Sequence, residues 1–194
     1  MTTEIGRPRN PRIDDAVLRA TVELIGELPY AELTVGAIAT RAGTSKPAIY
    51  RRWPSKAALV HEAVFPLHAG TELPNTGTLS GDIREMVRRT LVVFATPAAR
   101  AALPGLVGEM AADPALHNAL LERFGDIIVR GLGEYLQAAV HRGEIRAEIT
   151  ATDLAESIAG ITLVALLARG AVPDDAWIER TATLIVRGIS THDP

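Results

Sequence analysis

Apolar side chains recur at helical spacing along almost the whole chain, and glycine and proline gather between these stretches. Residues 13–28 place an apolar residue at every third or fourth position, which is the period of a helix with one buried face. Similar stretches cover residues 83–97, 114–142, 151–169 and 174–190. No stretch alternates apolar and polar residues as a strand does. The pattern predicts an all-α protein of about nine helices.

Between the first helix and residue 56 the helical stretches are short and have strong start and stop signals. Thr34 and Ser45 are good N-cap residues, and Gly43 between them suits the end of a helix. Pro47 falls in the first turn of the second helix, and Pro54 stops it. Two helices that cross through a short glycine turn form a helix-turn-helix, whose second helix enters the DNA major groove.

Positive charge is concentrated in this motif. The chain has a net charge of −3, yet residues 1–61 carry nine Lys or Arg against six Asp or Glu. Residues 41–56 contain five basic residues and no acid, including both lysines of the protein, Lys46 and Lys56. A basic helical unit on an acidic chain suits the phosphate backbone of nucleic acid.

The small or basic residues from Thr44 to Ala48 let the backbone approach base edges, and Lys46 can reach guanine acceptors. Tyr50, Arg52 and Lys56 suit phosphates. The candidate DNA-binding residues are Thr34, Thr44, Ser45, Lys46, Pro47, Ala48, Tyr50, Arg51, Arg52 and Lys56. The alternative is a solvated basic helix pair with no DNA role. For Trp53 we favour a place in the core beneath the second helix over stacking on a base.

These residues resemble the DNA-binding domain of the tetracycline-repressor (TetR) family. The matching segments are Leu33-Thr34-Val35, Ile38-Ala39, Ala42-Gly43, Ser45-Lys46-Pro47-Ala48-Ile49-Tyr50, Trp53 and Lys56-Ala57-Ala58-Leu59. After the tyrosine most members have an aromatic residue, His and Phe, whereas this chain has Arg51-Arg52-Trp53. The departure leaves the expected fold intact and changes the expected base contacts.

The expected domain division follows the motif. Residues 1–54 form the helix-turn-helix domain, with a basic arm at 1–11, and residues 55–194 form a helical effector-binding and dimerisation domain. A fourth helix from Ser55 to about Ala69 links the two, and the segment from Ala98 to Ala112 is expected to break at Pro104-Gly105. The arm is either a frayed terminus or a strand that follows the DNA backbone or minor groove.

The last two helices carry apolar stripes with small residues close by, which let helices approach closely. The resemblance implies a four-helix dimer interface here, and a two-fold dimer suits a palindromic operator. The alternative is that these stripes are core. The candidate interface residues are Leu154, Ile158, Ile161, Ala165, Trp177, Thr181, Leu184 and Ile185.

The resemblance also implies a small-molecule effector bound between the helices of the second domain. The candidate lining residues are His68, Met86, Arg89, Thr90, Phe94, Met110, Phe124, Ile128, Tyr135 and Thr162. Methionine and aromatic residues suit an adaptable apolar cavity. The alternative is that they are core. Arg89 and Glu109 either pair with each other, meet a polar group of the ligand, or lie on the surface.

Several functions find no support in the sequence. Cysteine is absent, so no thiolate catalyst or thiolate metal site exists. Nucleophile-elbow, P-loop, dinucleotide and zinc-protease motifs are absent, so neither an enzyme nor a cofactor is expected. His61 and His68 have only Glu62 and Glu72 close to them in the sequence, and a metal site needs more ligands of matching geometry, so no metal is expected. No 18-residue apolar run or signal peptide is found, which predicts a cytoplasmic location. Arginine far outnumbers lysine and alanine is abundant, a composition that indicates a bacterial genome rich in G and C.

The leading hypothesis is a homodimeric repressor that a small molecule releases from its operator. One alternative is a DNA-binding regulator or architectural factor without an effector. A more distant one is a helical enzyme or sensor with a vestigial head.

Overall fold

The computed structural model describes residues 11–66 and 72–191, apart from the side chains of residues 11 and 120–130. These residues are helical, as predicted, and the one β-type contact among them is an isolated bridge between Ile145 and Ser190. The helices are α1 (Pro11–Glu27), α2 (Val35–Arg41), α3 (Lys46–Tyr50), α4 (Lys56–Val64), α5 (Leu79–Phe94), α6 (Pro97–Ala112), α7 (Pro114–His141), α8 (Ala151–Arg169) and α9 (Asp175–Ile189). The predicted arm, residues 1–11, lies almost wholly outside the described residues.

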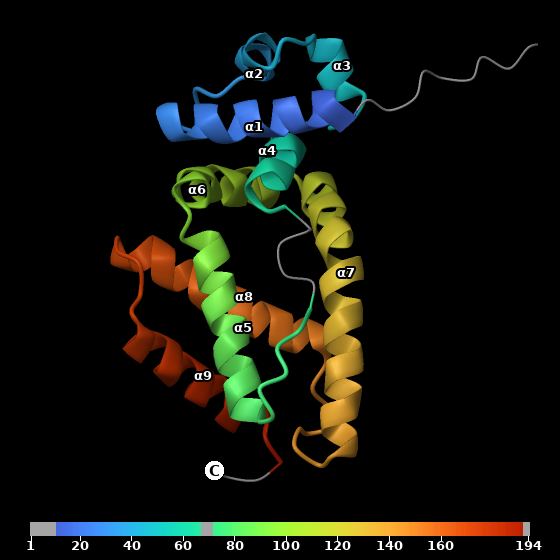
Figure 1. Ribbon diagram of the computed structural model, residues 1–194, viewed down its shortest axis with the longest axis vertical. Helices are drawn as coiled ribbons and strands as arrows, with labels where there is room; N and C mark the ends of the chain where they lie inside the picture. Colours follow the sequence, from blue (N-terminus) through green and yellow to red (C-terminus); the bar gives the residue numbers. More distant parts are fainter. Residues whose placement is uncertain (1–10, 67–71, 192–194) are drawn as a thin grey trace, which may run out of the picture.

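Helices α1–α4 form the head of the molecule (Figure 1). The predicted caps are present, because Thr34, Ser45 and Ser55 each accept a hydrogen bond from the backbone N–H three residues on. Such a bond satisfies an amide that a helix start leaves without a partner. Gly43 has φ of +65° in the turn between α2 and α3, a conformation that favours glycine. Local signals in the sequence therefore set the head's short helices.

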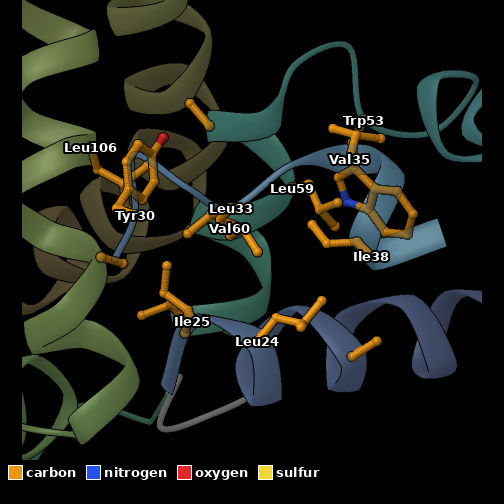
Figure 2. Packing of buried hydrophobic residues seen from close by; sticks show 14 of the residues in the cluster. Leu24, Ile25, Tyr30, Leu33, Val35, Ile38, Trp53, Leu59, Val60 and Leu106 are labelled. Atoms are coloured by element: carbon orange, nitrogen blue, oxygen red, sulfur yellow. The ribbon is translucent and has the colours of Figure 1, made fainter. Parts of the chain in front are cut away.

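The head closes around the first of two apolar cores. Val17 and Ile25 of α1, Ile38 of α2 and Ile49 of α3 are almost completely buried. Trp53 is buried with them, as predicted, and its indole N–H donates to Glu62 at 2.6 Å. Helix α6 contributes Ala99, Ala102, Leu103 and Leu106 to the same core. Figure 2 shows Tyr30 beside Leu106, with Leu33 and Val60 between them and the Trp53 end. Packing thus continues across the expected domain boundary at residue 54.

Helices α5–α9 form the body. Helix α6 lies directly beneath the head and is bent by 86° from the direction of α5, which descends from it (Figure 1). Helices α8 and α9 both pack along α5, and α7 packs on α8. The second core lies between them and includes Ile83 and Val87 of α5 and Trp177 of α9.

Two predictions about helix boundaries are wrong, one for α4 in the head and one for α6 in the body. The fourth helix ends at Val64, because Pro66 disfavours helical backbone at the residue before it. Helix α6 continues through Pro104 and Gly105. Proline removes one backbone donor from a helix, but Leu103 and Leu106 on either side are buried against the head and hold the helix in place.

By length and composition, one helix of the described residues, α8, could cross a membrane, or up to two spans if α5 and α6 are counted together as a bent one. In this structure α8 packs on α5 and α7 and, less extensively, on α9. Only 28% of its apolar window is buried within the chain, so much of its apolar surface faces outward.

Candidate nucleic-acid interface

The second helix of the motif, α3, is held from beneath and exposed on its outer side. Its Ile49 is 1% exposed in the head core. The preceding turn is fixed by the Thr44 amide, which donates to the Ala39 carbonyl at 2.9 Å. The outer side presents polar and basic groups, and Tyr50 is half exposed there. The exposed candidates are Thr34, Ser45, Lys46, Pro47, Tyr50 and Arg51, and the half-buried ones are Thr44 and Ala48.

Two arginines of the motif are already engaged by carboxylates of α1. Arg41 forms a two-pronged contact with Glu27, with distances of 3.0 and 2.9 Å, and a longer one of 3.5 Å with Glu23. The hydrogen bonds from Arg41 lower the pKa of Glu27. Arg52 pairs with Asp14 and donates to the Ala48 carbonyl. Arg52, a predicted phosphate contact, is therefore tied to the head itself.

Lys46 and Arg51 retain accessible charge. Both side chains are exposed, and within the described ranges neither has a carboxylate at ion-pair distance. The stem of Lys46 lies across Gly36 of α2, where an added Cβ would come within 2.6 Å of its Cε. Gly36 thus makes room for Lys46 at the start of α3. The accessible positive charges of Lys46 and Arg51 lie on the outer side of the motif.

Lys56 does not lie with these cations. Its ammonium is 3.3 Å from a carboxylate oxygen of Glu109 on α6 and donates to the Tyr30 carbonyl at 3.2 Å. This contact engages the charge inside the molecule, whereas the role of Lys56 as a phosphate contact stays a prediction. It also gives Glu109 the paired arrangement that the sequence left open, with Lys56 in place of Arg89 as the partner.

The predicted dimer interface also needs correction. Six of its eight residues are buried within their own chain. Five of these pack in the second core, Leu154, Ile158, Ala165, Trp177 and Ile185, and the sixth is the polar Thr181. Ile161 is half-buried, and Leu184 is 65% exposed. Sequence reasoning missed two exposed residues on α8, Val164 at 63% and Leu167 at 47%. A helix that is apolar on every side was the available signal.

The candidate effector-binding residues are spread over different environments. Met86 and Thr162 are buried, and the Thr162 hydroxyl donates to the Ile158 carbonyl. Thr90, Phe94, Met110 and Tyr135 are half-buried. Arg89 lies on the surface, where it pairs with Glu85 and donates to the Glu72 carbonyl. His68 and the side chains of Phe124 and Ile128 lie outside the described residues.

Tyr135 has a structural partner. Its hydroxyl donates to the buried carboxylate of Asp82 at 3.1 Å, and that carboxylate also accepts from the amide and hydroxyl of Thr76. Burial, and then the charge of Asp82, raise the pKa of Tyr135. This hydrogen-bond network joins the segment before α5 to α7. The Tyr135 hydroxyl therefore has a partner within the protein and needs no ligand.

A surface hollow of about 400 Å³ opens at the far end of α7, next to Gln137 and His141. None of the candidate effector-binding residues lines it. In the part of the chain that the structure describes, no group of three or more His, Cys, Asp or Glu could hold a metal ion.

The head and the body each match a known protein domain. Residues 17–63 match the family described as bacterial regulatory proteins, tetR family. Residues 73–185 match the domain described as tetracyclin repressor-like, C-terminal domain. Together these matches cover most of the chain. The match of residues 17–63 agrees with the helix-turn-helix geometry of the head and its basic outer side.

Whole-chain relatives agree. A helix-turn-helix transcriptional regulator of Mycobacterium tuberculosis is 32% identical over 183 residues, which cover 92% of this chain and 86% of the relative. The DNA-binding transcriptional repressor TetR of Mycobacteroides abscessus is 29% identical and covers 85% of this chain and 87% of its own length. The crystal structure of a TetR family transcription regulator is 28% identical, covers 91% of this chain and 98% of its own, and has a TM-score of 0.70.

This chain belongs to the TetR family of helix-turn-helix transcriptional regulators. Like the other members of its family, it is a regulator of transcription and not an enzyme.

Proposed function

We propose that the protein is a homodimeric repressor that binds a palindromic operator through the outer side of α3. The observation that carries this proposal is the accessible charge of Lys46 and Arg51 on a helix whose inner side is anchored by Ile49. The rest of the chain is acidic, so DNA is attracted to this side and repelled elsewhere. The relative from Mycobacteroides abscessus is described as a repressor, which supports the sign of regulation. We place the protein in the cytoplasm.

The proposed contacts divide into two kinds. Thr44, Ser45, Lys46, Pro47 and Ala48 face base edges in the major groove, where Lys46 donates to guanine. Thr34, Tyr50 and Arg51 contact phosphates and set the register. Arg52 supports α3 through Asp14 rather than binding DNA directly.

The proposed dimer surface is the outward side of α8 together with the neighbouring part of α9. Gly160, Ile161, Val164 and Leu167 follow one another at helical spacing on α8. An added Cβ at Gly160 would meet nothing within 4 Å in the same chain, which leaves room for a partner helix. Leu184 contributes from α9. A second copy that buries these exposed residues gives two heads related by a two-fold axis, as a palindrome requires.

The proposed effector is a small molecule that binds between α5, α6 and α7, near Thr90, Phe94 and Met110. Phe94 packs against both cores and stacks edge-to-face on Phe65 at 5.6 Å between ring centroids. A ligand beside Phe94 therefore touches the layer that joins head and body. It releases DNA only by binding better to the conformation with lower operator affinity.

The alternative is a DNA-binding regulator or architectural factor with no effector. One observation favours it: the hollow at Gln137 and His141 lies at the other end of α7 from Phe94 and Met110.

The test begins with selection of binding sites from random-sequence DNA by the wild-type protein, followed by gel shifts with DNA flanking the gene. We expect a palindromic site and loss of binding for Lys46→Ala with Arg51→Ala. A metabolite panel is then screened for thermal stabilisation, and each hit is added to the operator complex. Recovery of no site would refute the operator proposal, and operator binding that no stabilising compound weakens would favour the effector-free alternative.

A further inference from the structure

The head meets the body at a compact junction built from three segments. Tyr30 lies in the turn between α1 and α2, Lys56 is the first residue of α4, and Gly105 and Glu109 lie on α6. Tyr30 is 8% exposed and sits beside Leu106, at the end of the core away from Trp53 (Figure 2).

Lys56 holds the three segments together. Its ammonium lies 3.3 Å from Glu109, 3.2 Å from the Tyr30 carbonyl oxygen and 4.0 Å from the centre of the Tyr30 ring. An ammonium has three donors, and here a carboxylate, a carbonyl and an aromatic face surround it. The Lys56 side chain is only 23% exposed, so these contacts are partly shielded from solvent and salt.

Gly105 lets the Tyr30 ring lie against the backbone of α6. A Cβ at Gly105 would come within 2.1 Å of Cδ1 and 2.4 Å of Cγ of the ring. Both atoms belong to the rigid part of the side chain, so any larger residue must displace Tyr30. The preceding Pro104 gives no backbone hydrogen bond. The Tyr30 ring of the head therefore fits against α6 only at Gly105.

From this geometry we infer that Lys56 is a positioning residue, and that Lys56, Tyr30, Gly105 and Glu109 form a clamp that fixes the angle of the head on α6. The inference rests on the proposed function, because in a dimer this angle sets the separation of the two α3 helices. A dimer recognises half-sites only when their separation matches that of its recognition helices. The clamp thus determines which half-site spacing the repressor prefers.

The test measures spacing preference directly. The palindrome selected by the wild-type protein is remade with one or two base pairs added to or removed from its centre, and affinities are measured for the whole set. Wild-type protein prefers one spacing. Glu109→Gln frees Lys56 from α6, and the preference falls by roughly fivefold, the lower end of usual couplings between distant sites. Glu134→Gln on the exposed surface of α7 is the control of equal charge and keeps the wild-type preference.

Salt dependence separates a clamp from a phosphate contact. Lys56→Met keeps the apolar stem and removes the charge. If Lys56 contacted DNA, the slope of log affinity against log salt would fall by about one. A clamp predicts an unchanged slope, together with a spacing preference at least as broad as that of Glu109→Gln, because Lys56→Met also loses both contacts with Tyr30. The double variant then adds nothing to Lys56→Met, because the ion pair is already absent from that variant.

Two glycines of α6 give an independent comparison. Gly105→Ala pushes the Tyr30 ring away, whereas Gly108→Ala places its methyl group where nothing lies within 4 Å. Both changes raise helix propensity equally. We expect only Gly105→Ala to broaden the spacing preference, and circular dichroism checks that each variant is folded.

The outcomes are distinct. Failure of wild-type protein to bind any palindrome would sink the proposed function itself. Binding by wild type with an unchanged spacing preference in folded Glu109→Gln would overturn the clamp alone. A lower salt slope for Lys56→Met would return Lys56 to the DNA contacts.

Discussion

The head and the body are both helices closed around an apolar core, but they differ in what they leave on the surface. The head exposes charged and small polar groups, and its arginines are partly neutralised by its own carboxylates, as Arg41 is by Glu27. The body exposes Val164, Leu167 and Leu184. The first surface suits a polyanion and the second suits another protein surface.

This difference shows where each part of the function is encoded. Recognition of DNA depends on a few exposed side chains on a short helix, so it follows from residue identity at known positions. Assembly depends on which side of an apolar helix remains uncovered after the chain has folded. The two surfaces therefore respond differently to substitution. Four experiments test this comparison of head and body, at their surfaces, in their cores and at a helix start.

The largest expected effect lies on the body surface. Val164→Glu places a charge in the proposed dimer interface, where burial without a partner costs about 3–5 kcal/mol of association free energy. Sedimentation equilibrium should show a folded monomer with weakened operator binding. Val92→Glu on α5 is the control, because Val92 and Val164 are equally exposed at 63%. A Val164→Glu protein that remains a dimer would place the interface elsewhere, and dissociation by both changes to the same extent would show that the effect is not specific to α8.

The second experiment compares the two cores. Ile49 in the head and Ile83 in the body are both almost fully buried, and truncation of either to alanine should cost about 2–5 kcal/mol of stability. The chain has two tryptophans, Trp53 in the first core and Trp177 in the second. Trp53→Phe and Trp177→Phe backgrounds therefore report the unfolding of each core separately.

We expect Ile49→Ala to lower the melting temperature seen by Trp53 more than that seen by Trp177, and Ile83→Ala to do the reverse. Phe94 packs against both cores. Each variant should therefore also lower, to a smaller extent, the melting temperature reported by the tryptophan of the other core. Identical shifts at both probes for both variants would show that head and body unfold as one cooperative unit.

Sequence reasoning succeeded where the interactions are local. Thr34, Ser45 and Ser55 cap helices through bonds to residues three positions on, so the motif and its turn could be predicted from spacing. The assignments of Arg52 and Lys56 depended on contacts with Asp14 and Glu109. Those contacts join residues that are far apart in the sequence, and they depend on how the helices pack together, as α6 does on α4. No local pattern reveals them.

The body shows the same limit in another form. Helix α8 is apolar on several sides, so the stripe of Leu154, Ile158 and Ala165 looked as suitable for a partner as the stripe that contains Val164. Packing on α5 decides between them, because it buries the first stripe within the chain. The effector site stays a prediction for a related reason: cavity shape arises from the arrangement of several helices.

A third experiment tests the division of charge within the head. Arg51 and Arg41 are both exposed, but only Arg41 faces carboxylates. Arg51→Ala should lower the salt slope of operator binding by about 0.9, the value for one phosphate contact. Arg41→Ala should change the slope less, because the α1 carboxylates already neutralise part of its charge, and should lower stability only slightly. Equal slopes for both variants would contradict the proposed role of the α1 carboxylates.

The smallest expected effect is a pH dependence at the start of α8. Asp153 accepts hydrogen bonds from the hydroxyl and the amide of Thr150 and completes a capping box. These bonds lower the pKa of Asp153 below its ordinary value of 3.8. A carboxyl whose pKa is lower in the folded state stabilises the fold above its unfolded pKa, and this stability is lost as the pH falls through the folded pKa.

Urea unfolding at neutral pH should therefore show Asp153→Asn to be less stable than wild type, and the difference should shrink below about pH 3.8. Glu156→Gln, on the exposed side of the same helix, serves as the control of equal charge. A gap between wild type and Asp153→Asn that stays constant across this range would mean that the capping box does not depend on the ionised carboxylate.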